Sequence, residues 1–187
     1  MSGNSCYNIK KGLSDHGWIF QAYTGITASF LYTTEKLCFP MYSYMRSRNK
    51  VCIGDYLLCH AAFVLPAAFA CYKTDGDLKK LKGNTAYLSR MIDANIEGYR
   101  AIRSAGHTIL PKEDTDFESA AYRKTCLRFF KLICATSLGK ICVSDHAMNA
   151  VDEMSALDRD LKRFFEEAGA DDPVWQALER EAGKYLQ

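Results

Sequence analysis

One long apolar run constrains the fold of this chain more than any other feature. From Asp55 to Tyr72 no charged residue follows the opening aspartate, and the run contains one histidine and one proline. A helix that is apolar on all sides is typical of a buried core element or of a membrane span. A span needs about 20 apolar residues, whereas this run offers about 17, with His60 and Pro66 among them. We therefore expect a buried core helix, bent or restarted just before Pro66, and no membrane span.

Apolar residues at helical spacing predict four further helices. They begin at Asn84 or Thr85, at Phe117, at Ser144 or Asp145 and at Pro173, which takes the first helical position, and they end at Gly106, Leu138, Gly169 and Leu186. Glycine or proline marks most of these ends, as expected for helix termini. Together with the apolar run, the pattern predicts an all-α domain, a bundle of about five helices.

The first fifty residues follow a different pattern. Residues 18–34 are rich in aromatic and β-branched side chains, with Gly25 in the middle, which favours one or two short strands or a hairpin. Two strands alone do not form a stable sheet in water, so they would need the helical body, a partner chain or a further domain. We therefore divide the chain into a β-like N-terminal lead, residues 1–50, and a helical domain, residues 51–187.

Charge, cysteines and short motifs narrow the classes of function. The formal net charge is +2, and no basic block with interleaved aromatic residues marks a nucleic-acid surface. The eight cysteines show no CxxC or Cys/His spacing for a metal, and many lie inside apolar helical patterns. We expect buried thiols in a reducing cytoplasm and no metal site. Neither a G-x-G-x-x-G or Walker loop nor a G-x-S-x-G elbow occurs, so no nucleotide cradle or acyl-transfer nucleophile is predicted.

Polar side chains that interrupt the apolar patterns are the candidates for a functional site. His146, Asn149 and Glu153 are spaced i, i+3, i+7, which places them in one row beside the apolar stripe of a helix. Such a row either lines a cleft or forms a solvated edge. Asn95 lies inside the stripe of the second helix and is either a site residue or a buried structural amide. His60 is either a core histidine or a ligand or base.

Three segments of the chain suggest a family. The segments are DYLLCHAAFVLP at residues 55–66, MIDANIEGYRAIRSAGHTILP at 91–111 and HAMNAVDEM at 146–154, followed by Pro173. In order and spacing they resemble the C-terminal helical domain of the ketopantoate (2-dehydropantoate) reductase family, over about residues 51–186. The resemblance implies that a Rossmann domain that binds NADPH is missing, and that the helical domain closes over a 2-oxo acid. Residues 18–39 resemble, more weakly, the last strands of that missing domain.

The resemblance also implies roles for single residues. Glu153 matches the family's substrate-cleft glutamate and is the candidate catalytic residue, while Ser144 matches its substrate-contacting serine. The remaining candidates for the substrate site are His146, Asn149, His60 and Asn95.

The family's catalytic lysine has no counterpart in this chain. Its place is taken by Tyr56 or Leu57, and His60 or Ala61 stands where the family has its first asparagine. The general acid that would protonate a carbonyl oxygen is therefore absent from that helix.

Two functions remain open from the sequence. The first is the substrate or dimerisation domain of an NADPH-dependent 2-oxo acid oxidoreductase, not catalytic alone, which needs a Rossmann-domain partner for the cofactor. The alternative is a non-enzymatic helical module for dimerisation or small-molecule binding. The expected partners are a second copy of the chain or a Rossmann domain, with a small 2-oxo acid as ligand.

Overall fold

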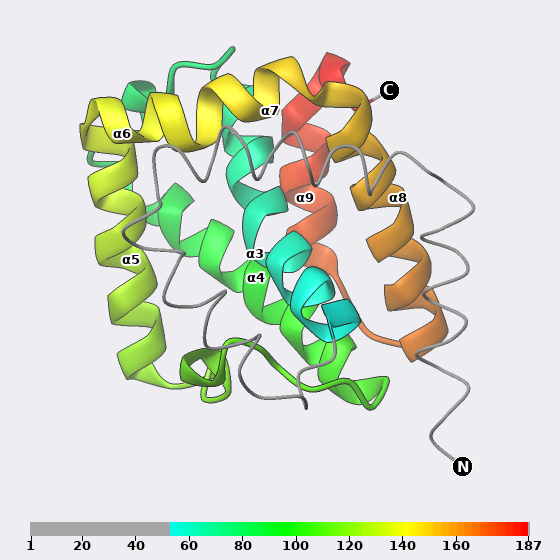
Figure 1. Ribbon diagram of the computed structural model, residues 1–187. Coiled ribbons are helices and arrows are strands. Elements are labelled where there is room, and N and C mark those ends of the chain that lie inside the picture. The colour runs from blue at the N-terminus through cyan, green and yellow to red at the C-terminus, as the bar shows by residue number, and fades with distance from the viewer. Residues whose placement is uncertain (1–52, 187) are drawn as a thin grey trace. The chain divides into compact units, whose positions relative to one another are not determined.

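The computed structural model describes residues 53–186, and all regular structure within that range is helical (Figure 1). The chain divides into two units, Met1–Tyr56 and Leu57–Gln187, and nearly all described residues belong to the second. The all-α class predicted for the domain is confirmed. The strands expected in residues 18–34 lie outside the described residues.

Five helices of ten or more residues make up the body described by residues 53–186. They are α3 (Ile53–Lys73), α4 (Thr85–Ser104), α5 (Ala120–Ala135), α8 (Val151–Ala168) and α9 (Pro173–Ala182). The short elements are η1 (Leu78–Leu81), η2 (Lys112–Asp114), α6 (Ser137–Gly139), the π-helical turn η3 (Lys140–Ser144), α7 (Asp145–Asn149) and η4 (Gly183–Tyr185). Helix α4 packs against α5, α8 and α9, and Figure 1 shows α3 and α4 between α5 and α8.

Local signals set several of the helix ends. The Asn84 side chain accepts a hydrogen bond from the backbone N–H of Tyr87 and caps α4, as predicted. Helix α8 ends at Gly169, whose positive φ of 59° suits a residue without a Cβ atom. Pro173 occupies the first turn of α9, where its missing N–H costs nothing. These predicted ends are therefore confirmed.

Helix α3 runs without interruption from Ile53 to Lys73, so of the predicted bend or restart before Pro66 the restart does not occur. Proline removes the N–H that would bond to the carbonyl four residues earlier, which is that of Ala62. In the structure the side-chain amide of Asn95 donates to this carbonyl at 3.4 Å. A side chain from α4 thus replaces the missing backbone donor, which allows the helix to continue past the proline.

The helix predicted from Phe117 begins later, at Ala120. Ser119 is its N-cap, with the hydroxyl accepting from the backbone N–H of Tyr122 at 3.1 Å. The acidic stretch before it forms only the single turn η2. Phe117 is fully buried ahead of the helix, edge-on to the ring of Tyr99, so tertiary packing fixes this segment rather than helix propensity.

The single helix predicted from Ser144 to Gly169 is also wrong. Ser144 belongs to the π-helical turn η3 and caps nothing, and the chain leaves the helical conformation at Ala150, with φ −123° and ψ 39°. The Tyr72 hydroxyl donates to the carbonyl of Ala147 at 3.0 Å. A continuous helix would use that carbonyl for the residue four positions later. The contact with α3 therefore accompanies the break between α7 and α8.

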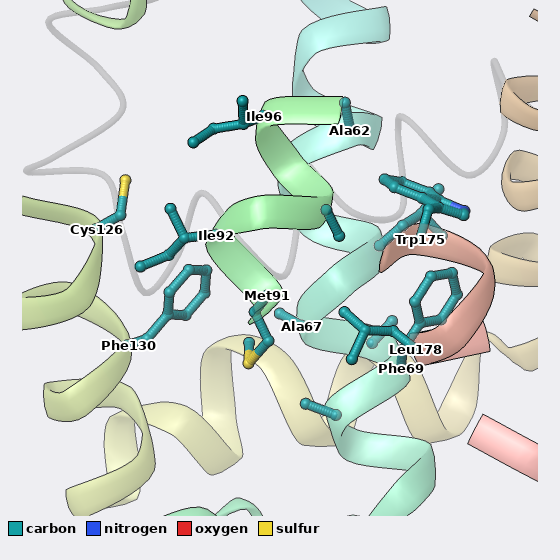
Figure 2. Close-up of a cluster of buried hydrophobic side chains, with 14 of the residues drawn as sticks. Ala62, Ala67, Phe69, Met91, Ile92, Ile96, Cys126, Phe130, Trp175 and Leu178 are labelled. Carbon is teal, nitrogen blue, oxygen red and sulfur yellow. The ribbon is translucent and has the colours of Figure 1, made fainter. Parts of the chain in front are cut away.

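The core lies where α3 and α4 meet α5 and α9 (Figure 2). Trp175 of α9 is fully buried, and its ring lies edge-on to Phe69 of α3, with 5.5 Å between ring centroids. Burial of a large apolar side chain stabilises a fold by about 1.5–3 kcal/mol. Gly98 allows close approach of α4 to α3, because a Cβ there would lie 2.8 Å from that of Ala62. This packing fixes the helices that carry the candidate site.

One helix in the described part of the chain, Gly54–Lys73, is long and apolar enough to cross a membrane. Within the body 56% of its most apolar window is buried. Burial of this extent is compatible with the core helix of a soluble protein.

Candidate functional site

Three of the predicted site residues, each on a different helix, are linked through His146, which is close enough to each of the other two to shift its pKa. They are His60 on α3, His146 on α7 and Glu153 on α8. Desolvation by the surrounding protein lowers the pKa of His60, and nearby His146 lowers it further. Desolvation raises the pKa of Glu153, against the smaller lowering effect of the same His146. We call these side chains the His60–His146–Glu153 cluster.

Solvent reaches this cluster. The His60 side chain is exposed, although the protein around it is dense enough to lower its pKa, and His146 and Glu153 are half-buried. Of the two alternatives for His60, the exposure of its side chain favours a ligand or base over a core histidine. Helix α3 is buried on every face only in its second half, from Leu65 to Tyr72, whereas most positions in 57–64 retain some exposure. This half of α3 is therefore only partly enclosed by the core of the described residues.

Desolvation disfavours the charged forms of two side chains in the cluster, His60 and Glu153. A lowered histidine pKa keeps His60 uncharged near neutral pH, with one ring N–H donor and one acceptor nitrogen. Desolvation raises the pKa of Glu153, so its carboxyl group holds a proton to a higher pH than an exposed glutamate does. Such an arrangement suits a small ligand with oxygen atoms to be bound or protonated.

Ser144 lies outside this cluster. Its hydroxyl is buried and accepts a hydrogen bond from the thiol of Cys71 at 3.6 Å. Burial raises the pKa of Cys71 to about 12, so the thiol keeps its proton. Ser144 also lines a cleft of about 440 Å³, together with Asp145, Met148 and the turn at residues 75–79. A ligand that contacts Ser144 would therefore have to bind in this cleft.

Asn149 closes the end of α7 rather than joining the cluster. Its exposed side-chain amide donates to the carbonyl of Asp145 at 2.6 Å, within the same helix. The expected row of three residues required one continuous helix, and the break at Ala150 interrupts it. Of that row, only His146 and Glu153 remain candidates for a common site.

Asn95 is a buried structural amide, which was one of its two possible readings. It is 1% exposed, donates to the carbonyl of Ala62 and accepts from the hydroxyl of Tyr122 at 2.5 Å. Both of its partners lie in the core between α3, α4 and α5. Its amide is therefore committed to the fold, as buried polar groups generally are.

A second buried polar cluster was missed by sequence reasoning. The Glu97 carboxylate accepts from the backbone N–H groups of Val174 at 3.1 Å and Trp175 at 2.8 Å, at the start of α9. Asp158 of α8 accepts from the indole N–H of Trp175 at 2.8 Å, and desolvation raises its pKa to about 6. These partners are separated by up to 78 residues along the chain, so no local pattern reveals them.

NADPH does not fit the described residues. Dinucleotide sites use a glycine-rich turn between a strand and a helix, and residues 53–186 contain no strand. Over the same residues, no three His, Cys, Asp or Glu side chains gather in a metal-binding arrangement. No protein-family model, curated protein or solved structure matches this chain.

Proposed function

We propose that this chain is the substrate-side helical domain of an NADPH-dependent 2-oxo acid oxidoreductase and is not catalytic alone. The resemblance to the C-terminal domain of ketopantoate reductases motivates the proposal. The observation that carries it is the His60–His146–Glu153 cluster, in which His146 of α7 interacts electrostatically with both His60 of α3 and Glu153 of α8. A separate Rossmann domain would hold the cofactor, since the described residues offer no cradle for it.

Reduction of a 2-oxo acid requires a proton on the oxo oxygen, and the family's lysine is absent here. Glu153 is the candidate donor, because its raised pKa favours the protonated form. The ring N–H group of His146 is suited to hold the substrate carboxylate. Glu153 is thus the residue whose removal should affect turnover most.

Steady-state kinetics tests the proposal. The purified chain is assayed for ketopantoate-dependent NADPH oxidation, alone and with the product of a neighbouring reading frame that carries G-x-G-x-x-G. We expect no turnover by the chain alone and turnover with the partner. A general acid contributes about 10²–10⁴-fold, so Glu153→Gln should lower kcat by at least about 100-fold. Glu167→Gln, at an exposed position of the same helix, is the matched control. Turnover by the chain alone, or none with the partner, would contradict the proposal.

A second candidate is a non-enzymatic module that dimerises or binds a small molecule. The cleft of about 440 Å³ beside Ser144 favours it, because Thr136, Ser137 and Lys79 line the same space as Ser144, together with the ion pair of Lys140 and Asp145. If this candidate is right, small carboxylic acids should raise the melting temperature of the chain, and Ser144→Ala should abolish the shift. Sedimentation of the chain alone would measure the expected dimer.

The cysteines support a reducing compartment. All five cysteines in residues 53–186 are free thiols, and four of them are buried. Secreted proteins of this size usually pair such residues. We therefore propose a cytoplasmic location, which fractionation of the native cell would test.

A further inference from the structure

The large apolar side chains that remain exposed all lie in one stretch of the described chain. Phe129, Leu132, Leu138 and Ile141 are between 41% and 51% exposed, and they belong to α5, α6 and η3. Scattered single apolar residues are ordinary on a protein surface, whereas a local group marks an interaction site. We call this surface the α5–η3 face.

All charged Asp, Glu, Lys and Arg positions in the same stretch are basic. Residues 120–144 contain no Asp or Glu. Lys124, Arg128 and Lys131 are exposed and form no ion pair with another described residue. Their spacing of i, i+4, i+7 puts them in one row along α5, and Leu132 lies directly beside that row. The α5–η3 face thus presents a basic row next to an apolar one.

A cleft of about 440 Å³ lies at the C-terminal end of α5 and is separate from the basic row. Ile133, Thr136, Ser137 and Lys140 of the same stretch line it together with Asp75, Asp77 and Asp145, so the cleft itself is not a basic surface. Each exposed apolar side chain is also about half covered by its neighbours, so it lies in the surface rather than projecting from it. The apolar side chains of a partner protein can pack against such a surface.

We propose that the α5–η3 face binds an acidic amphipathic helix of another protein. An apolar stripe on that helix would cover Leu132 and Ile141, and carboxylates on its flank would pair with the row Lys124, Arg128 and Lys131. A lipid surface would need side chains that reach into the bilayer, and these are half covered. A two-fold contact with a second copy through this face would oppose the basic row to itself.

Fluorescence anisotropy of the full chain tests the proposal. The probe is a labelled synthetic helix with Leu or Phe every three or four residues and Glu on the flanking positions. We expect saturable binding that weakens as salt is raised. The doubles Leu132→Ser/Ile141→Ser and Lys124→Glu/Lys131→Glu should each weaken binding at least tenfold.

The matched control is Lys112→Glu/Arg159→Glu, at exposed positions outside the face, and it should bind like the wild type. Circular dichroism confirms that each variant is folded. Equal binding of a probe with Lys in place of Glu would overturn the proposal, as would the absence of saturable binding. So would preferential binding to phosphatidylserine-containing vesicles, or self-association of the chain that the same doubles abolish.

Discussion

Asp158→Asn separates the cost of ionising a buried carboxyl group from the value of its hydrogen bond. Asp158 is 4% exposed and accepts from the indole N–H of Trp175 at 2.8 Å. Its charged neighbours are Glu179, which opposes ionisation, and Lys162, which favours it. Asparagine has nearly the same shape and keeps an oxygen for the indole, but it cannot ionise.

The raised pKa of Asp158 determines how much the substitution changes the free energy of unfolding. Burial moves the pKa of Asp158 from 3.8 to about 6, and each pKa unit corresponds to about 1.36 kcal/mol, so the full effect is about 3 kcal/mol. The folded protein binds this proton more tightly than the unfolded chain. The contribution of this proton to the free energy of unfolding is therefore fully present below about pH 4 and is lost as the pH rises to about 6. Asp158→Asn should stabilise the protein by up to about 3 kcal/mol at pH 8 and change it little at pH 4.

Urea unfolding followed by circular dichroism at both pH values measures this effect. Asp152→Asn, at an exposed position of the same helix, is the control and should leave both free energies of unfolding unchanged. Equal destabilisation by Asp158→Asn at the two pH values would refute the reasoning. It would mean that the ionised carboxylate, with Lys162, contributes favourably to the fold.

Three further predictions concern buried polar groups. Glu97→Ala removes both acceptors at the start of α9 and should lower the free energy of unfolding by about 2–4 kcal/mol, measured in urea. Asn95→Ala should destabilise the protein less in a Pro66→Ala background, because the new N–H of residue 66 can bond to the freed carbonyl of Ala62. A double-mutant cycle should show about 1 kcal/mol of coupling between the two positions. Tyr87→Phe should leave stability unchanged or raise the melting temperature, because this buried hydroxyl has no hydrogen-bond partner among residues 53–186. A loss above about 1 kcal/mol would reveal a hidden partner.

Helix ends with a local signal could be predicted from the sequence. Asn84 caps α4 through an N–H three residues away, and Gly169 ends α8 through its own backbone conformation. Periodicity likewise predicts the all-α class, because each helix carries its apolar stripe within its own sequence.

Features that depend on distant contacts could not be predicted. Pro66 normally disrupts a helix, and nothing near it in sequence shows that Asn95 of another helix replaces its missing donor. The break at Ala150 has no glycine or proline to announce it and coincides with the bond from Tyr72 to Ala147. Tertiary contacts override local propensity at both places.

The candidate site was predictable only in part, for the same reason. The sequence predicts His146 and Glu153 as polar residues beside an apolar stripe, and in the structure His146 is close enough to both Glu153 and His60 of α3 to shift their pKa values. Asn149 was grouped with them on the assumption of a straight helix, which the break at Ala150 removes. Single-helix spacing cannot identify partners that belong to separate helices.

Calorimetric titration of the purified chain with ketopantoate, and separately with NADPH, tests the central claim most directly. We predict saturable heat from ketopantoate that Glu153→Gln abolishes, and no saturable heat from NADPH. Binding of ketopantoate should also weaken as the pH rises through the raised pKa of Glu153, because the carboxylate then repels the ligand. Saturable NADPH binding, or ketopantoate binding that is absent or unaffected by Glu153→Gln, would contradict the account.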